Sequence, residues 1–267
     1  MFQPWEFEAL LQYMDKEKNI VRIQLEPLLM PESKKTEVLG TNYKGLTWIF
    51  EKLERTLKEM NENLEVAWDH FNFSGHSFGG WLALDVFRTI RQHPKRPAAL
   101  RIRTGYMRCP VTKPYAREEG RFMGVDVSRQ EAEEAATTLK SKIESFEREG
   151  CPIIKRSGST PPFGMNHAYN SSVSWAEGAT WLDFWDGPSM YDLLDEMTVC
   201  PDESAIIVFE HGTADINVPC QDSLDTVEML KAKFPKLNIT CLLIEGKAHA
   251  WDYDRDLSEI LWLFELY

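Results

Sequence analysis

The 267-residue sequence lacks long apolar runs, an excess of basic residues and any close pairing of cysteines. No stretch approaches the roughly 18 consecutive apolar residues that a bilayer-spanning helix requires. The first residues also lack the basic start and apolar core of a signal peptide. The net charge of −12 disfavours nucleic acid as a partner, because binding phosphates requires clustered Lys and Arg. We therefore expect no membrane span and no nucleic-acid partner.

The cysteines are few and scattered, and no two have C-x-x-C spacing: Cys109, Cys151, Cys200, Cys220 and Cys241. Free thiols are typical of a reducing compartment, so we expect a cytoplasmic protein without a disulfide framework. No two histidines share metal-ligand spacing with a carboxylate, and the sequence therefore predicts no metal site.

The sequence does contain a G-x-S-x-G pentapeptide, Gly-His-Ser-Phe-Gly at residues 75–79, followed by Gly80. The preceding segment, 69–74, has β character, and residues 81–88 are apolar at helical spacing. Strand, sharp turn and helix is the context that makes this pentapeptide a nucleophile elbow. Ser77 is therefore the candidate nucleophile, with a chance match as the alternative.

Segments of β and helical pattern alternate along much of the chain, which predicts an α/β fold with a mostly parallel sheet flanked by helices. The expected helices are 5–17, 42–60, 222–233 and 255–266, and the expected strands are 19–25, 98–103, 204–210 and 238–244, besides the elbow.

Residues 105–203 interrupt this alternation with a helical pattern at about 129–148 and long aromatic-rich stretches. A segment of this length is too long for a connecting loop, so we interpret it as an inserted cap over the active site. The core would then consist of residues 1–104 and 204–267. The alternative for each cap aromatic is that it only fills the small core of the cap.

Two polar residues follow the last two expected strands of the core. Asp215 comes after strand 204–210, and His249 comes after strand 238–244. The carboxyl ends of parallel strands meet at the edge where α/β sheets bind ligands. A serine hydroxyl needs a base, and the base needs an orienting carboxylate. We therefore expect Asp215 and His249 to meet Ser77 at this edge.

Each of these assignments has an alternative. Asp215 could simply shape a turn, and His249 could be a capping or surface histidine. His211 and His76 are rival bases. His211 shares a loop with Asp215, so its side chain is expected to buttress the turn. His76 adjoins Ser77 on the tight elbow and is expected to point away from it.

Three motifs together resemble the α/β-hydrolases: Gly-His-Ser-Phe-Gly-Gly, His-Gly-Thr-Ala-Asp-Ile-Asn-Val-Pro and Gly-Lys-Ala-His-Ala-Trp-Asp. The sequence is most similar to the hormone-sensitive-lipase-like (α/β-hydrolase fold-3) esterases. The resemblance implies Ser77 as nucleophile, His249 as general base and Asp215 as orienting acid. It also implies the backbone N–H of Phe78 as an oxyanion donor, and no metal or organic cofactor.

The sequence departs from this family at its start, where the His-Gly-Gly-Gly loop that completes the oxyanion hole is missing. The fold is therefore expected to be N-terminally shortened, without the first strands. A bare strand edge invites pairing with another chain, so we expect either a homodimer through that edge or a shortened form. Loss of oxyanion donors would also slow the reaction.

The expected function is hydrolysis of a carboxylic ester or lactone of a hydrophobic small molecule, through an acyl-enzyme on Ser77. The expected substrate pocket consists of His76, Phe163, Trp181, Trp185, Tyr191 and Trp251. Two alternatives stay open. One is a non-hydrolytic enzyme of small-molecule biosynthesis, and the other is a catalytically impaired protein that binds a ligand or a partner.

Overall fold

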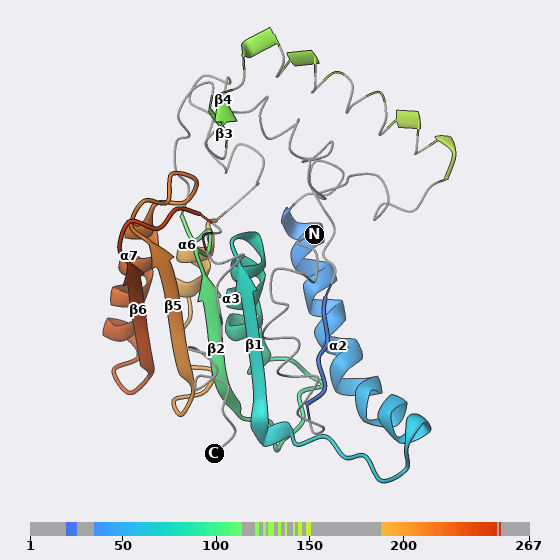
Figure 1. Ribbon diagram of the computed structural model, residues 1–267. Helices are drawn as coiled ribbons and strands as arrows, with labels where there is room; N and C mark the ends of the chain where they lie inside the picture. The colour runs from blue at the N-terminus through green and yellow to red at the C-terminus, as the bar shows by residue number, and fades with distance from the viewer. Residues whose placement is uncertain are drawn as a thin grey trace. The chain divides into compact units, whose positions relative to one another are not determined.

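The described parts of the computed structural model (Figure 1) are residues 20–25, 35–113, 188–249 and 251, with short stretches between 121 and 150. The chain divides into two compact units. The sheet unit comprises residues 42–113 and 188–267, and the second unit comprises residues 1–41 and 114–187.

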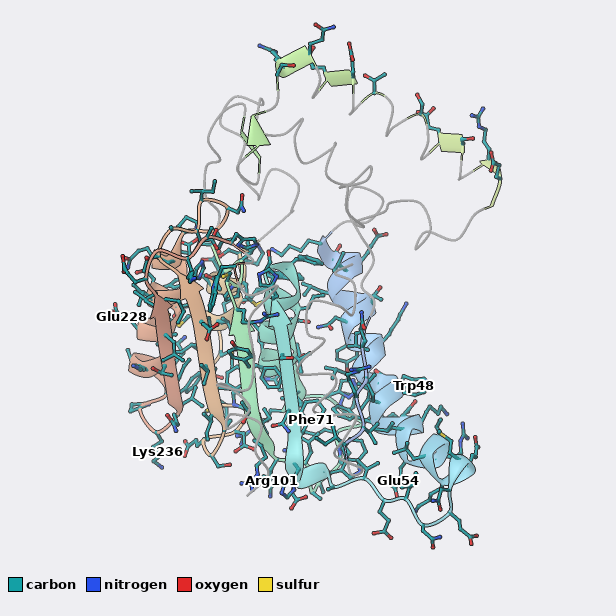
Figure 2. The ribbon with its side chains drawn as sticks, viewed as in Figure 1. Trp48, Glu54, Phe71, Arg101, Glu228 and Lys236 are labelled. Atoms are coloured by element: carbon teal, nitrogen blue, oxygen red, sulfur yellow. The ribbon has the colours of Figure 1, made fainter. Side chains whose placement is uncertain are left out.

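The sheet unit is built on four parallel strands in the order β1-β2-β5-β6: β1 (Phe71–His76), β2 (Ile102–Arg108), β5 (Ile206–Gly212) and β6 (Asn238–Ile244). All four arrowheads point to the same end of the sheet, and Arg101, labelled directly before β2, lies at the other end (Figures 1 and 2). The parallel sheet that the sequence predicted is confirmed.

Helices connect these strands and pack in a layer: α3 (Phe78–Ile90), α6 (Met190–Asp195) and α7 (Cys220–Lys233). α6 contacts both α3 and α7, while α3 packs on β1 and β2, and α7 packs on β5 and β6. The long helix α2 (Lys35–Met60) and the short 3-10 helix η2 (Trp68–His70) precede the sheet. The expected flanking of the sheet by helices is confirmed.

The core consists of large side chains that are fully buried, and it covers both faces of the sheet, because the successive residues Tyr106 and Met107 of β2 point to opposite faces. Phe87 and Ile90 come from α3, Tyr106 and Met107 from β2, and Phe209 from β5. Burial of such side chains is the main favourable contribution to folding. The core therefore fixes the strands whose carboxyl ends carry the candidate site.

A buried polar contact joins α2 to α3. Asn42 Nδ2 donates to Asp85 Oδ2 at 2.8 Å, and Arg88 Nη2 donates to Asp85 Oδ1 at 2.6 Å. Both carboxylate oxygens of Asp85 are thus satisfied, as a buried charge requires. Trp48 lies on the exposed side of α2 (Figure 2), with 46% of its surface accessible.

The strand expected at 19–25 is wrong for residues 20–25, which the structure describes without strand conformation. β-branched residues favour a strand only when a neighbouring strand pairs with them. The strand expected at 98–103 is misplaced, because β2 begins at Ile102 and extends to Arg108. Gly105 lies inside the extension, and glycine is uncommon in the interior of a strand. Glycine at this position leaves room for the Phe73 ring, which would lie only 2.5 Å from a Cβ there.

The second unit contains a short antiparallel pair, β3 (Arg121–Phe122) and β4 (Val125–Asp126). The structure assigns residues 105–113 and 188–203 to the sheet unit, and a covering role of 105–203 stays a prediction. The helices expected at 5–17 and 255–266 lie outside the described residues. Among the described helices, none has the length and apolarity needed to cross a bilayer.

Candidate active site

The elbow between β1 and α3 holds Ser77 in a rare backbone conformation, with φ 52° and ψ −115°. The Ser77 N–H donates to Arg108 O at 2.7 Å, and Ser77 O accepts from Trp81 N at 3.1 Å. A non-glycine residue in this region costs on the order of 1–3 kcal/mol, and such strain clusters at functional sites. The surrounding hydrogen bonds therefore keep the side chain of Ser77 at the strand–helix turn.

Two of the three elbow glycines are required by close contacts. A Cβ at Gly75 would lie 2.0 Å from Gly79 O, and a Cβ at Gly80 would lie 2.9 Å from Pro110 Cβ. A Cβ at Gly79 would meet nothing within 4 Å outside its own helix backbone. Of the two glycines that follow Phe78, it is therefore Gly80 and not Gly79 that lacks room for a side chain.

This difference predicts opposite outcomes for two matched substitutions. Gly75→Ala is expected to lower the free energy of unfolding by about 3 kcal/mol, because strand and helix must separate to admit the methyl group. Gly79→Ala is expected to be neutral or stabilising by up to about 1 kcal/mol, because alanine favours a helix over glycine. Urea unfolding measures both, and equal destabilisation by the two would contradict the elbow geometry.

The loops after β5 and β6 are tied to each other by backbone contacts. Thr213 N donates to Ile244 O at 3.0 Å, and Ala214 N donates to Lys247 O at 2.9 Å. A Cβ at Gly212 would lie 2.1 Å from Lys247 O, so only glycine fits at the end of β5. This pairing brings Asp215 and His249 to the same place from separate strands.

The structure brings Ser77, His249 and Asp215 together in a hydrogen-bonded row. His249 Nε2 lies 3.0 Å from Ser77 Oγ, and His249 Nδ1 lies 2.7 Å from Asp215 Oδ2. The side chain of His249 is 5% exposed, and that of Asp215 is 0% exposed. An Nδ1–H that donates to the carboxylate leaves an Nε2 lone pair able to accept the Ser77 proton.

Asp215 is stabilised as a carboxylate despite its burial. Burial alone would raise the pKa of Asp215, but hydrogen bonds from His211 and His249 hold it well below its usual value. The second oxygen, Oδ1, accepts from Asn217 N at 2.8 Å and from Val218 N at 2.9 Å. The carboxylate is therefore charged at neutral pH and its orientation is fixed.

His76 and His211, the rival bases, have different surroundings. His76 is buried, with its ring centroid 5.0 Å from that of His249. Burial, with the neighbouring His249, lowers the pKa of His76 well below its usual value. His211 lies in β5 and not in the loop where it was expected. Its Nε2 lies 3.0 Å from Val218 O, so it does buttress the turn, and it also lies 3.1 Å from Asp215 Oδ2.

Cys109, directly after β2, was not singled out from the sequence. Its thiol sulfur lies within 4.8 Å of a ring nitrogen of both His76 and His249, a donor set that could hold a metal ion. Burial, with the nearby charge of Asp215, raises the pKa of Cys109 to about 12. Both ring nitrogens of His249 are already engaged, Nδ1 with Asp215 and Nε2 with Ser77, so a metal ion would have to displace one of these contacts. We therefore describe Cys109, His76 and His249 as a group of neighbouring polar side chains and not as a metal site.

The expected pocket residues are only partly described. His76 lies buried beside His249, and Tyr191 lies on α6 with Lys113 Nζ 4.3 Å from its ring centroid. Trp251 is half-buried, with Lys247 Nζ 5.5 Å from its ring centroid. Phe163, Trp181 and Trp185 lie outside the described residues. Phe78 is the first residue of α3, so its N–H belongs to the positive end of that helix.

Asp222, in the first turn of α7, is a buried carboxyl group outside the row. Among the described residues, its Oδ2 has no hydrogen-bond partner. Burial, opposed in part by Lys113, raises the pKa of Asp222 from 3.8 to about 6. Folding thus disfavours the charged form, so the contribution of this group to stability is complete below about pH 4 and is lost as the pH rises through 6.

Asp222→Asn is therefore expected to raise the free energy of unfolding by about 1–2 kcal/mol near pH 7.5. It should also flatten the dependence of this free energy on pH between about pH 4 and pH 7, since the amide does not titrate. Urea unfolding of both proteins across this range is the measurement. An unchanged pH dependence in the variant would show that Asp222 is not the group responsible.

The arrangement of the strands and the site matches a known architecture. The nucleophile elbow follows one parallel strand, and the acid and histidine follow two later strands in the chain order Ser, Asp, His. This is the order of the α/β-hydrolases. The chain resembles the α/β-hydrolases. The closer similarity to the hormone-sensitive-lipase-like group stays a prediction.

Comparisons with known proteins give a likeness to solved structures only. No family model and no curated protein matches the sequence. A monoacylglycerol lipase from Paleococcus ferrophilus is 15% identical and has a TM-score of 0.39, with 85% of this chain and 75% of that chain covered. Esterase 2 of Thermogutta terrifontis, phosphonylated by sarin, is 15% identical and has a TM-score of 0.41, with 82% and 58% covered.

Esterase B of Lactobacillus rhamnosis is 12% identical and has a TM-score of 0.45, with 89% of this chain and 64% of that chain covered. This chain therefore spans less than two thirds of either esterase. Because identities and TM-scores are low, the function proposed below rests on the residues of this chain.

Proposed function

We propose that this protein is a serine hydrolase that cleaves a carboxylic ester or lactone of a hydrophobic small molecule. The observation that carries the proposal is the position of His249 between Ser77 and Asp215, at 3.0 Å and 2.7 Å. Nucleophile, base and orienting acid within hydrogen-bond reach are the requirement for covalent catalysis by serine. The positive φ of Ser77 adds support, since strained backbone of this kind clusters at functional sites.

In the proposed reaction, His249 Nε2 takes the hydroxyl proton as Ser77 Oγ attacks the carbonyl carbon. Asp215 stabilises the imidazolium through Nδ1–H, and the Phe78 N–H, beside Ser77 at the start of α3, donates to the oxyanion. His249 then protonates the leaving alcohol, and an acyl group stays on Ser77. Water, activated by the same histidine, releases the acid and restores the serine.

The substrate class is proposed from the surroundings of the site. The net charge of −12 disfavours anionic substrates. Tyr191 and Trp251 are proposed as apolar contacts for the substrate, together with Phe163, Trp181 and Trp185. A cytoplasmic location and a homodimer are parts of the same proposal, and no metal or organic cofactor has a step in it.

Turnover of short-chain p-nitrophenyl esters tests this function. We expect p-nitrophenolate release that saturates with ester concentration, and an initial burst if loss of the acyl group is the slow step. Absence of release above the rate in buffer, at every chain length from acetate to octanoate, would contradict the proposal. Bound small molecules without turnover would then favour a ligand-binding role.

A further inference from the structure

His211 is completely buried near the carboxyl end of β5, and its ring makes contacts through both nitrogens. Nε2 lies 3.1 Å from Asp215 Oδ2 and 3.0 Å from Val218 O, while Nδ1 lies 2.7 Å from Ser223 Oγ on α7. Ser223 is also buried. The proposed mechanism uses neither residue, although one of them touches the same carboxylate oxygen as His249.

These contacts determine where the ring proton of a neutral His211 lies. Asp215 Oδ2 and Val218 O are both acceptors, so Nε2 must carry the proton and donate. Nδ1 is then an acceptor, and the Ser223 hydroxyl donates to it. The two acceptors at Nε2 thereby select the tautomer of His211, and the Ser223 hydroxyl, which can donate or accept, satisfies Nδ1 in that tautomer.

Asp215 consequently receives four donors. His249 Nδ1 and His211 Nε2 meet at Oδ2, while Asn217 N and Val218 N meet at Oδ1. A carboxylate offers about four lone-pair positions, and these four donors fill them, with the thiol of Cys109 as a further neighbour of Asp215. It can neither rotate nor accept a water without losing a bond. Removal of the His211 donor would free Oδ2 on the side that His249 does not occupy.

We propose that His211, supported by the Ser223 hydroxyl, is a positioning residue that holds Asp215 Oδ2 in place for His249. This inference rests on the proposed function only for its kinetic consequences. Without the His211 donor, Asp215 Oδ2 keeps more of its negative charge for its bond to His249. His249 should then stay protonated up to a higher pH. The other ionisable groups near His211 are Asp215, Asp222, His76 and Cys109.

A matched pair of variants separates positioning from packing. His211→Gln places an amide N–H2 at about the reach of Nε2, whereas His211→Asn is one methylene shorter and cannot donate to Oδ2. We expect His211→Asn to lower kcat for a p-nitrophenyl ester by about 10- to 100-fold with KM nearly unchanged. His211→Gln should retain at least about a third of the activity. The acidic limb of the kcat/KM profile should move to higher pH in His211→Asn only.

A second measurement needs no turnover. Nitrogen-15 NMR of the wild-type protein is expected to show His211 with its proton on Nε2, and Ser223→Ala should weaken that preference. A proton on Nδ1 in the wild type would overturn the inference even if the variants do not fold. Equal activity and equal pH profiles for the Gln and Asn variants would also overturn it. An inactive wild type with the expected tautomer would instead reject only the hydrolase function.

Discussion

Ser77→Ala is expected to lower kcat for a short-chain p-nitrophenyl ester by about 100,000-fold. The Oγ that His249 Nε2 contacts at 3.0 Å is the only atom removed. Without it, His249 has no nucleophile to activate, and no acyl-enzyme can form. The fold should persist, because the Ser77 backbone, not its hydroxyl, bonds to Arg108 and Trp81.

Ser74→Ala is the matched control for this loss. Ser74 lies on β1, the strand that leads into Ser77, three residues before it, and is exposed. Removing its hydroxyl should change kcat less than about twofold, as expected for a surface position. Comparable losses in the two variants would mean that the assay reports stability or a contaminating esterase. Retained activity in Ser77→Ala would remove Ser77 from the mechanism.

Asp215→Asn is expected to lower kcat by about 10,000-fold, the scale seen when a catalytic histidine is held in the wrong tautomer. The amide oxygen can still accept the backbone N–H groups of Asn217 and Val218. The amide N–H2 must then face His249 Nδ1 and His211 Nε2, both of which are donors. His249 can satisfy the amide only by moving its proton to Nε2, where it blocks acceptance from Ser77.

Asp222→Asn is the control for Asp215→Asn, because it neutralises a neighbouring buried carboxyl group that lies outside the row. It should leave kcat within about threefold of the wild type while changing the dependence of stability on pH. A fall of less than tenfold in Asp215→Asn, with normal activity in Asp222→Asn, would show that the carboxylate does not orient His249.

The row could be found from the sequence because each of its residues follows a strand that the sequence marks clearly. β6 spans the predicted residues, and β5 differs from its predicted range by two residues at each end. The apolar run of β5 is typical of a buried parallel strand. Parallel strands bring their carboxyl ends to one edge, so order along the chain was enough to group Ser77, Asp215 and His249.

Other features depend on contacts that no local pattern encodes. Gly80 is required because Pro110, from the end of β2, packs against it, and Cys109 reaches the site from the same strand end. Ser223 meets His211 only because α7 turns back along β5. The segment 20–25 has a strand-like composition without strand conformation, since composition does not supply a pairing partner.

Site-mapped labelling with a fluorophosphonate probe tests the central claim most directly, because it detects an activated serine without knowledge of the substrate. The account predicts a single adduct, located by peptide mass spectrometry on Ser77. It also predicts that the adduct is absent in Ser77→Ala and strongly reduced in Asp215→Asn. A folded wild-type protein that takes no label on Ser77, or is labelled on another residue, would contradict the account.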